Sequence, residues 1–369
     1  MKVLVTGAKG FVGRNLVADL SRNEEIQIFE FDLDTPREKL ELWAKEADFV
    51  FHLAGVNRPE NTEDFMEGNF GFTSELLDLL IKHKNQAPVM LSSSIQALRD
   101  NPYGQSKKAG EDLLFQYSKE YNVPVYIYRF SNLFGKWSKP NYNTVVATFC
   151  HNIARDIEIQ VNDPKAEIEL CYIDDVITEL KLLIEGKGNK DDNFYCVPTV
   201  HKILIGELAE LIQSFKDSRK NLLIPDMKDE FSKKLYATYL SFLPENDFSY
   251  ELKMNVDHRG SFTEFLKSDE RGQVSINVAK PGIIKGQHWH HTKNEKFLVV
   301  SGEGVIRFRK VGEDKVIEYP VSGEKLEVVD IPTGYTHNIE NTGKTDMVTV
   351  MWANEVFDPN NPDTFYEEV

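Results

Sequence analysis

The stretch that decides the fold is KVLVTGAKGFVG, residues 2–13, at the start of the chain. It opens on a mostly apolar run that predicts a buried strand, and glycines follow at positions 7, 10 and 13, where a segment of helical periodicity begins. Glycine at these positions permits a tight turn and lets the backbone approach a pyrophosphate at the positive end of the helix. A simple strand–helix turn is the alternative, but the place of the glycines between strand and helix favours a dinucleotide site.

Short apolar runs alternate with amphipathic segments from this point to about residue 240. Parallel strands need crossover helices, so the alternation indicates a doubly wound, Rossmann-type α/β parallel sheet. The expected strands are residues 2–6, 26–31, 49–53, 89–92 and 125–129, and the expected helices include residues 13–20, 73–82, 107–120 and 205–215.

The pattern changes after residue 242 to short β-type runs that glycines interrupt, as is typical of a small antiparallel all-β barrel. Residues 244–247 form the expected linker. The sequence therefore predicts two domains, residues 1–243 and residues 244–369. The expected barrel strands are residues 274–278, 297–301, 305–310, 326–331, 337–340 and 347–352.

Charge and composition exclude some classes of function. The formal net charge of −16 argues against a nucleic-acid partner or an anionic membrane surface, because both attract positively charged proteins. The chain opens without the basic segment and apolar run of a secretory signal, and no stretch approaches the roughly 20 apolar residues of a membrane span. Its three cysteines, Cys150, Cys171 and Cys196, lie far apart in apolar runs and are expected as buried thiols. These features favour a cytoplasmic protein.

Tyr103 and Lys107 stand four residues apart in a predicted helix and therefore share one face of it. An ammonium beside a phenol favours the phenolate, so we expect Lys107 to lower the pKa of Tyr103. A serine run, residues 92–94, precedes the pair and can supply a hydroxyl that hydrogen-bonds a substrate carbonyl. An incidental surface pair is the alternative. Together with the glycine stretch, these residues predict a reductase in which hydride reaches carbon while Tyr103 protonates oxygen.

Charged residues near the second expected strand bear on the choice of dinucleotide. Asp32 ends that strand, where a carboxylate can accept hydrogen bonds from the adenosine ribose. Lys9, inside the glycine stretch, and Arg37, just beyond Asp32, offer positive charge to a ribose phosphate. The two signals conflict, and we expect NADPH, with NADH as the alternative.

Six short motifs within the first 200 residues match one enzyme family in order. They are FHLAG at 51–55, GNFG at 68–71, SSS at 92–94, Tyr103 with Lys107, RFSNLFG at 129–135 and YIDDV at 172–176. This series resembles the extended short-chain dehydrogenases, which act on nucleotide sugars. The resemblance implies that Ser94, Tyr103 and Lys107 are catalytic and that Lys107 also holds the nicotinamide ribose. With the residues above, the dinucleotide contacts that it implies are Gly7, Lys9, Gly10, Phe11, Val12, Gly13, Asp32, Arg37, Leu53, Ala54, Gly55, Asn69, Tyr103 and Lys107.

Positions 95 and 96 depart from one branch of that family. Its sugar 4,6-dehydratases carry an acidic pair there, whereas this chain has Ile95 and Gln96, which cannot act as acid and base. The departure disfavours dehydration and leaves simple reduction or 4-epimerisation.

Histidines gather in two stretches of the second half, GIIKGQHWHHTKNE at 282–295 and PTGYTHNIEN at 332–341. Residues two apart on a strand face the same way, so His288 and His290 both point into the barrel, whereas His291 points out. Glu295 follows after a turn and His337 comes from another strand, which completes a set of three nitrogens and one carboxylate. Such a set suits Zn²⁺, Fe²⁺, Ni²⁺ or Mn²⁺, and zinc is the expected metal. The alternative is surface histidines on a purely structural barrel.

The spacing of both stretches resembles the two motifs of cupin (jelly-roll) barrels, although Leu326 replaces the leading glycine of the second. The sequence DHRGSFTE at 257–264, followed by His288, further resembles the sugar-nucleotide 3,5-epimerases. That resemblance implies that His288 is a catalytic base and that Lys285 and Lys296 handle phosphate and enolate charge. Because those epimerases generally need no metal, whether His288 is base or ligand stays open.

The combination of the two halves resembles the bifunctional capsular polysaccharide biosynthesis reductase/epimerases of the UDP-N-acetyl-L-fucosamine pathway. It implies that the cupin epimerises C3 of a UDP-2-acetamido-2,6-dideoxy-hexos-4-ulose. The first domain would then reduce C4 with NADPH to give the L-talose sugar. Such barrels often pair, so a homodimer or higher homo-oligomer is expected. Three alternatives remain: a cupin that only binds sugar or joins subunits, a dinucleotide-sensing regulator, and metal-dependent oxygenation.

Overall fold

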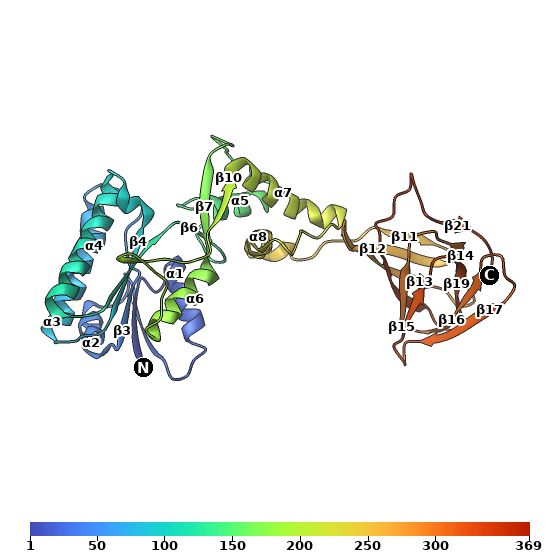
Figure 1. Ribbon diagram of the computed structural model, residues 1–369, viewed down its shortest axis with the longest axis horizontal. Coiled ribbons are helices and arrows are strands. Elements are labelled where there is room, and N and C mark those ends of the chain that lie inside the picture. Colours follow the sequence, from blue (N-terminus) through green and yellow to red (C-terminus); the bar gives the residue numbers. More distant parts are fainter. The chain divides into compact units, whose positions relative to one another are not determined.

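The computed structural model describes residues 1–369, and the chain divides into two compact units (Figure 1). The first unit comprises Met1–Gln213 and Asp229–Pro244, and the second comprises Ser214–Lys228 and Glu245–Val369. The expected fold class is confirmed: the first unit contains a parallel Rossmann-type sheet, and the second is an all-β barrel. None of the helices combines the length and the apolar character that crossing a membrane requires.

The segment Ser214–Lys228 belongs to the second unit although it precedes the expected linker. Its backbone pairs with a strand of the barrel, because the Ile224 N–H donates to the Lys267 carbonyl at 2.9 Å. The Lys267 N–H in turn donates to the Leu222 carbonyl at 2.8 Å. Apolar periodicity alone does not predict a pairing between residues so far apart in the sequence.

The first unit is built on a seven-stranded sheet in the order β2-β1-β3-β4-β5-β9-β8. All neighbouring strands are parallel except β8 and β9. Because β2 and β3 lie on opposite sides of β1, the connections diverge at its carboxyl end and open a crevice there. The strands are β1 (Lys2–Thr6), β2 (Gln27–Phe31), β3 (Phe49–His52), β4 (Val89–Ser94), β5 (Val125–Phe130), β8 (Lys190–Asp191) and β9 (Phe194–Tyr195).

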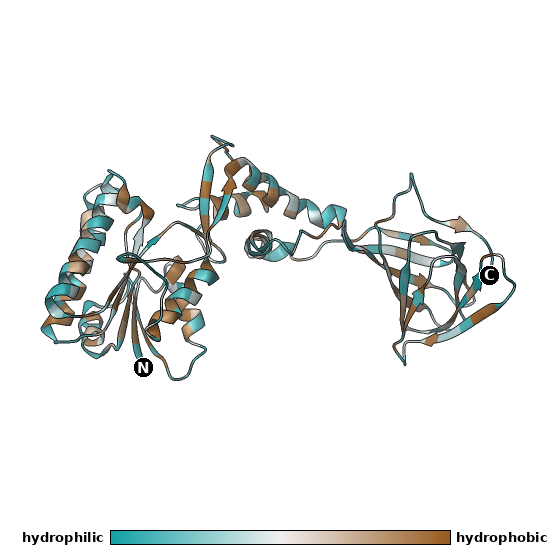
Figure 2. Cartoon of the chain, in the orientation of Figure 1, coloured by the Kyte–Doolittle hydropathy of each residue, from teal (hydrophilic) through white to brown (hydrophobic).

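Helices cover both faces of this sheet (Figure 1). Side chains alternate along β1, so that Val3 and Val5 share a core with α1 and α6, whereas Leu4 shares another with α2, α3 and α4. Parallel strands buried on both faces are apolar throughout, and they are largely brown in Figure 2. The helices are α1 (Phe11–Leu20), α2 (Arg37–Glu46), α3 (Phe72–Lys82), α4 (Pro102–Tyr121), α5 (Val145–Ile153) and α6 (Ile173–Ile184).

Smaller elements complete the first unit. A three-stranded sheet has the order β10-β7-β6, in which β7 is antiparallel to β10 and parallel to β6. A π-helix, η1 (Met66–Gly71), leads directly into α3, and a 3-10 helix, η2 (Ile95–Leu98), follows β4. The remaining elements are β6 (Asn132–Phe134), β7 (Glu167–Tyr172), β10 (His201–Leu204), α8 (Glu230–Leu240) and the beginning of α7 (Ile205–Asn221).

Two antiparallel sheets form the barrel of the second unit, in the orders β11-β12-β13-β20-β15-β18 and β17-β16-β19-β14-β21. Apolar residues of both sheets, among them Phe297, Ile306 and Met347, meet in one buried core. The second unit also contains a 3-10 helix, η3 (Glu245–Asp247). The strands are β11 (Met254–Asp257), β12 (Gly260–Ser268), β13 (Gly272–Ala279), β14 (Ile284–Trp289), β15 (Glu295–Ser301), β16 (Glu303–Lys310), β17 (Val316–Ser322), β18 (Val328–Ile331), β19 (Tyr335–Asn341), β20 (Met347–Ala353) and β21 (Phe365–Tyr366).

The expectation of three buried thiols is wrong at one position. Cys150 and Cys171 are buried, but Cys196 is exposed. Cys196 directly follows β9, a two-residue strand that pairs with β5 through a single residue pair. Apolar neighbours in the sequence do not bury a side chain that lies just beyond so short a strand near the edge of the sheet.

A buried ion pair holds α4 against the sheet. The Glu111 carboxylate of α4 is fully buried and accepts two hydrogen bonds from the Arg129 guanidinium of β5, at 2.9 and 2.5 Å. The Ser93 hydroxyl of β4 donates a third, at 2.5 Å. Because α4 also carries Tyr103 and Lys107, this network helps to place both side chains at the ends of the strands.

Replacing Glu111 by alanine leaves the Arg129 guanidinium without its partner in a largely buried position. We expect the free energy of unfolding to fall by about 3 kcal/mol, the usual cost of breaking a buried pair. Urea unfolding followed by the helical circular dichroism signal, which comes mainly from the first unit, measures this loss. Asp112→Ala, on the same helix, removes an exposed ion pair with Lys108 and should cost less than about 1 kcal/mol. Equal losses in the two variants would contradict the expectation.

Candidate active sites

A cavity of about 1530 Å³ opens in the first unit at the carboxyl ends of β1, β3, β4 and β5. Its walls are formed by the loops that follow these strands and by the beginning of α1, as expected at the point where the strand order reverses. Nearly all dinucleotide contacts expected from the sequence line it: Gly7, Lys9, Gly10, Phe11, Val12, Gly13, Asp32, Arg37, Leu53, Ala54, Gly55, Tyr103 and Lys107.

The glycine loop after β1 leaves no room for side chains. Gly7 has a φ of +69°, and a Cβ atom there would lie 2.7 Å from the Ala54 nitrogen, so only glycine fits. Gly10 precedes α1 without a side-chain cap, and the first N–H groups of the helix therefore have no side-chain acceptor. Free N–H groups at a helix N-terminus attract anions, so this end of the cavity can bind a pyrophosphate.

Charged groups of both signs surround the end of β2. The Asp32 carboxylate accepts the Lys9 N–H at 2.7 Å and the Leu33 N–H at 2.8 Å, which ties the glycine loop to β2. The Lys9 ammonium pairs with Asp34, and the Arg37 guanidinium pairs with Glu75 at 2.8 Å. Both ion pairs are exposed and therefore weak, so either cation can exchange its partner for a phosphate.

Three expected catalytic residues converge on this cavity. Ser94 ends β4, while Tyr103 and Lys107 lie on α4, and all three line the cavity wall. The Ser94 hydroxyl is close enough to the Tyr103 phenol to lower its pKa, although burial has the larger effect. The Lys107 ammonium lies 5.8 Å from the centre of the Tyr103 ring and donates to the Ser92 carbonyl at 3.1 Å. The arrangement can present a hydroxyl, a phenol and an ammonium to one carbonyl group.

The expected lowering of the Tyr103 pKa is not found. Burial raises the pKa of Tyr103, and this effect outweighs the hydrogen bond from Ser94, which acts in the opposite direction. Burial also lowers the pKa of Lys107 to about 8. Spacing on a helix predicts which side chains meet, but desolvation depends on the surrounding loops.

Asn69 plays a different part from the one expected. It is buried and does not line the cavity. Its amide exchanges hydrogen bonds with the Val56 backbone at 2.9 and 3.0 Å and donates to the Ser106 hydroxyl at 2.9 Å. Asn69 therefore holds the loop after β3 against α4, instead of facing a cofactor. The loop is close to α4, since a Cβ atom on Gly55 would lie 2.8 Å from the Lys107 nitrogen.

Sequence reasoning missed an aromatic residue opposite the catalytic helix. Tyr142 lines the same cavity, and its phenol is close enough to contribute to the raised pKa of Tyr103. Two cations lie over its ring, Lys139 at 4.9 Å and Arg58 at 5.8 Å from the ring centre. The signal in the sequence is KWSKPNY at 136–142, a cluster of cations and aromatics directly after the RFSNLFG motif.

A buried histidine lies at the end of β3, behind the residues that line the cavity. His52, at the end of β3, is buried between two hydroxyls, with Nδ1 2.7 Å from Thr6 Oγ1 and Nε2 2.9 Å from Thr73 Oγ1. Burial, with a smaller contribution from the Lys107 ammonium, lowers the pKa of His52 to about 3. The folded protein therefore excludes a proton that the unfolded chain accepts near pH 6.5.

This difference predicts a pH-dependent loss of stability that His52→Gln should remove. The folded pKa is the lower one, so the stabilising contribution is complete above pH 6.5 and declines as the pH falls toward 4. We expect the wild type to lose up to about 1.4 kcal/mol per pH unit more than the variant over that range. Urea unfolding at several pH values measures it, and parallel curves for the two proteins would refute the assignment.

The second unit brings four potential metal ligands together. His288 lies on β14, Glu295 on β15 and His337 on β19, while His290 follows the end of β14, and one ligand atom of each lies within 4.8 Å of the others. Glu295 Oε2 is 3.5 Å from His290 Nε2 and 3.4 Å from His337 Nε2. These three atoms are buried without a hydrogen-bond partner. A divalent cation would satisfy all of them, so the residues fit the expected metal.

Backbone details determine how the histidines face. A β-bulge interrupts β14 between Gly286 and His288, and Gln287 has a φ of +65°. His290 Nδ1 lies 2.5 Å from the Asp363 carbonyl oxygen, to which it can only donate, so that Nε2 keeps its lone pair for a metal. His291 is exposed and lies outside the set, as the sequence predicts.

A second cavity, of about 780 Å³, lies beside these ligands inside the barrel. His288, Glu295 and His337 reach its wall, together with Lys285 and Lys293. The Lys285 ammonium is held at this wall, because it donates to Asn277 Oδ1 and the Val278 carbonyl, each at 2.8 Å. The cavity thus combines a cation site with positively charged side chains.

The expected place of Lys296 is wrong. It follows Glu295 on β15, and neighbouring residues on a strand point to opposite sides, so Lys296 faces away from the cavity. Its side chain is half exposed and pairs with Asp330 of β18. Lys293 reaches the cavity instead and donates to the Thr364 hydroxyl at 3.1 Å.

Comparison with known proteins identifies relatives for both units. The NAD dependent epimerase/dehydratase family matches residues 3–195, and the polysaccharide biosynthesis C-terminal domain matches residues 255–365. A Pseudomonas aeruginosa UDP-2-acetamido-2,6-beta-L-arabino-hexul-4-ose reductase is 47% identical over 99% of this chain and 98% of its own length. A crystal structure of the capsular polysaccharide assembling protein CapF from Staphylococcus aureus covers all of both chains, with 58% identity and a TM-score of 0.95. A Bacillus cereus UDP-glucuronic acid 4-epimerase with NAD, at 19% identity and a TM-score of 0.57 over 66% of this chain and 98% of its own, shares the fold.

Proposed function

We propose the function of this chain from one premise: the chain belongs to the NAD dependent epimerase/dehydratase family. With a polysaccharide biosynthesis domain at its other end, it is an enzyme of nucleotide-sugar metabolism that uses NAD(P). The proposal is a bifunctional enzyme of capsular polysaccharide precursor synthesis. The second unit epimerises C3 of a UDP-2-acetamido-2,6-dideoxy-hexos-4-ulose, and the first unit reduces C4 to the UDP-linked L-talose sugar. The activity for which the Pseudomonas relative is named supports the 4-keto substrate.

The convergence of Ser94, Tyr103 and Lys107 in one cavity carries the reductase assignment. NADPH held at the glycine loop would supply the hydride for C4. As the carbonyl electron pair moves onto O4, the Tyr103 phenol gives its proton to that oxygen, and the product is an alcohol. The Ser94 hydroxyl orients O4, and the Lys107 ammonium stabilises the phenolate that remains.

We also propose NADPH instead of NADH as the reductant. Lys9 and Arg37 line the cavity beside the end of β2, and both are cations whose present partners are exposed carboxylates. A phosphate on the adenosine ribose would be a stronger partner for either of them. Asp32 could favour NADH by accepting hydrogen bonds from the adenosine ribose. Its carboxylate already accepts two backbone N–H groups, so this preference is weaker than the sequence suggests.

The proposal for the second unit rests on chemistry beside a ketone. A base removes the C3 proton, the electron pair passes to O4 as an enolate, and reprotonation from the opposite face inverts C3. Zinc is the proposed metal, and His290, Glu295, His337 and His288 would hold it, where it would supply a Lewis acid. Lys285 and Lys293 offer positive charge in the same cavity. His288 would serve either as the fourth ligand or as the base, and the exchange at C3 depends on it in both roles.

A homodimer joined through the barrels is part of the proposal. β11 is an edge strand that pairs only with β12, and all four of its residues are exposed. Met254 and Val256 are 60% and 68% exposed. An unpaired edge with apolar side chains is the kind of surface that a second copy covers. We also propose a cytoplasmic location, because both proposed reactions act on nucleotide-linked sugars.

The reductase assignment predicts the behaviour of Tyr103→Phe. Loss of the proton donor should lower kcat for NADPH oxidation with the 4-ketosugar at least about 100-fold. Tyr121→Phe, at the exposed end of the same helix, should leave turnover unchanged. Stopped-flow measurement of NADPH absorbance tests both. Full turnover by Tyr103→Phe would refute Tyr103 as the proton donor, whereas a wild-type protein without turnover would return the chain to the dinucleotide-sensing alternative.

The epimerase assignment predicts solvent exchange without any reductant. In D₂O and in the absence of NADPH, the 4-ketosugar should gain deuterium at C3, as read by mass spectrometry and NMR. Tyr103→Phe should retain this exchange, whereas His288→Asn should lose it and still reduce a ketosugar that is already inverted at C3. A wild-type protein that introduces no deuterium would leave the barrel as a sugar-binding or assembly module.

A further inference from the structure

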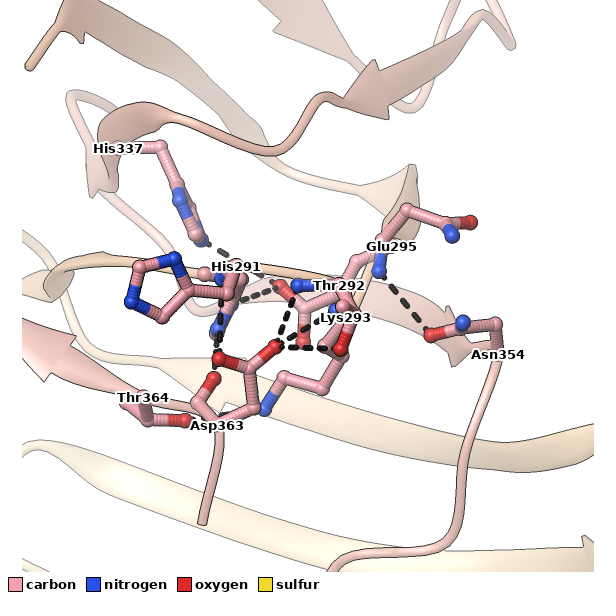
Figure 3. Close-up of polar contacts among 10 residues, drawn as sticks. His291, Thr292, Lys293, Glu295, His337, Asn354, Asp363 and Thr364 are labelled. Atoms are coloured by element: carbon pink, nitrogen blue, oxygen red, sulfur yellow. Dashed lines mark hydrogen bonds and ion pairs between the residues drawn. The ribbon is translucent and has the colours of Figure 1, made fainter.

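The last residues of the chain form a segment that crosses the ligand-bearing end of the barrel, here called the C-terminal strap (residues 354–369). Figure 3 shows its Asp363 carboxylate beneath the turn that follows His290. The carboxylate accepts the N–H groups of His291, Thr292 and Lys293 at 2.9, 2.7 and 2.8 Å. It also accepts the Thr292 hydroxyl at 3.1 Å. This turn joins two of the four ligands, His290 and Glu295.

The same residue also fixes the first of these ligands directly. The Asp363 carbonyl oxygen lies 2.5 Å from His290 Nδ1, which sets the tautomer and orientation of that ring. His290 Nε2 then points at the ligand cluster, buried and without a partner. A strap that only covered the end of the barrel would not need to orient His290 Nε2. A group bound at that nitrogen explains the contact.

The strap reaches the other three ligands through their neighbours in the sequence. Glu367 N–H donates to the Gln287 carbonyl at 3.1 Å, and Val369 N–H donates to Gln287 Oε1 at 3.0 Å, beside His288. The Thr336 hydroxyl, beside His337, donates to the Glu367 carbonyl. Asn294, beside Glu295, donates its N–H to Asn354 Oδ1 at 3.0 Å, and its carbonyl accepts the Asn354 N–H at 3.2 Å. Every ligand therefore has an immediate neighbour, or its own ring, held by the strap.

We infer that the C-terminal strap is the outer shell of the metal site, in which Asp363 is the positioning residue. This inference rests on the proposed metal site. Residues 357–362 of the strap are exposed, so its docking depends on the contacts around Asp363 and the last strand. Ligand groups must be held within about 0.5 Å of a productive geometry, which loops achieve only when second contacts hold them. Metal binding and strap docking are thus linked, and each should strengthen the other.

Asp363→Ala removes the carboxylate that holds the turn and keeps the chain length. We expect the Zn²⁺ affinity of the full-length protein, measured by competition with a chromogenic chelator, to fall about 10- to 100-fold. The absorption bands of bound Co²⁺ should change as well, because they report ligand geometry. Asp363→Asn keeps the main-chain carbonyl and one side-chain acceptor and should recover part of the affinity. Asp358→Ala is the matched control, since that exposed strap carboxylate contacts no ligand-bearing turn.

The outcomes separate the two proposals. The proposed metal site itself is refuted if the wild-type protein binds no stoichiometric zinc. It is also refuted if a His337→Ala variant binds zinc as tightly as the wild type. Tight wild-type binding with equal affinity in Asp363→Ala would overturn the strap inference alone. If Asp363→Ala fails to fold, hydrogen exchange of the wild type decides: zinc should slow the exchange of the amides of residues 291–293, 367 and 369. No change in their exchange on zinc removal would refute the linkage.

Discussion

The reductase site depends on how closely two backbone loops approach at the carboxyl ends of β1 and β3. Gly7 meets the Ala54 backbone with no room for a Cβ atom, whereas a Cβ atom on Gly55 would meet the ends of the Asn69 and Lys107 side chains. Asn69 then ties the second loop to α4 through Ser106. The catalytic helix, the glycine loop and the loop after β3 are therefore connected. A side chain added at Gly7 would push the glycine loop away from the loop after β3, and one added at Gly55 would press on Asn69 and Lys107.

In the barrel, contacts between strands and the C-terminal strap hold the candidate ligands in place. Three of its candidate ligands come from residues 288–295 and the fourth, His337, comes from β19, and three of the candidate ligand atoms are buried with no partner. Leaving such atoms unsatisfied is unfavourable, so the cluster is stable only with a cation or with the support of the surrounding backbone. Asp363 supplies that support because its carboxylate accepts three successive backbone N–H groups of the turn and so holds the turn by its main chain.

Periodicity and motif spacing predict the parts of this protein that local sequence determines. Five strands of the parallel sheet, the glycine loop and the two short motifs that carry the four candidate metal ligands are each apparent from residues near one another in the chain. What they do not predict depends on distant packing. Burial overrides the expected effect of Lys107 on the Tyr103 pKa. Lys296 faces outward because it alternates with Glu295 on β15. The residues that Asp363 contacts lie some 70 residues away along the chain. The sequence around Tyr142 shows a cluster of cations and aromatics, but nothing in it indicates a role for Tyr142.

The chemistry of the two proposed reactions sets their order. The C3 hydrogen of the sugar is acidic only while C4 is a ketone, because the ketone oxygen takes up the electron pair that deprotonation leaves behind. Reduction of C4 removes this route and makes the configuration at C3 permanent. Epimerisation must therefore precede reduction, and the reductase selects which C3 epimer is withdrawn from the equilibrium. The specificity of the first unit, whose cavity places Tyr142 and two cations opposite Tyr103, then decides the stereochemistry of the final product.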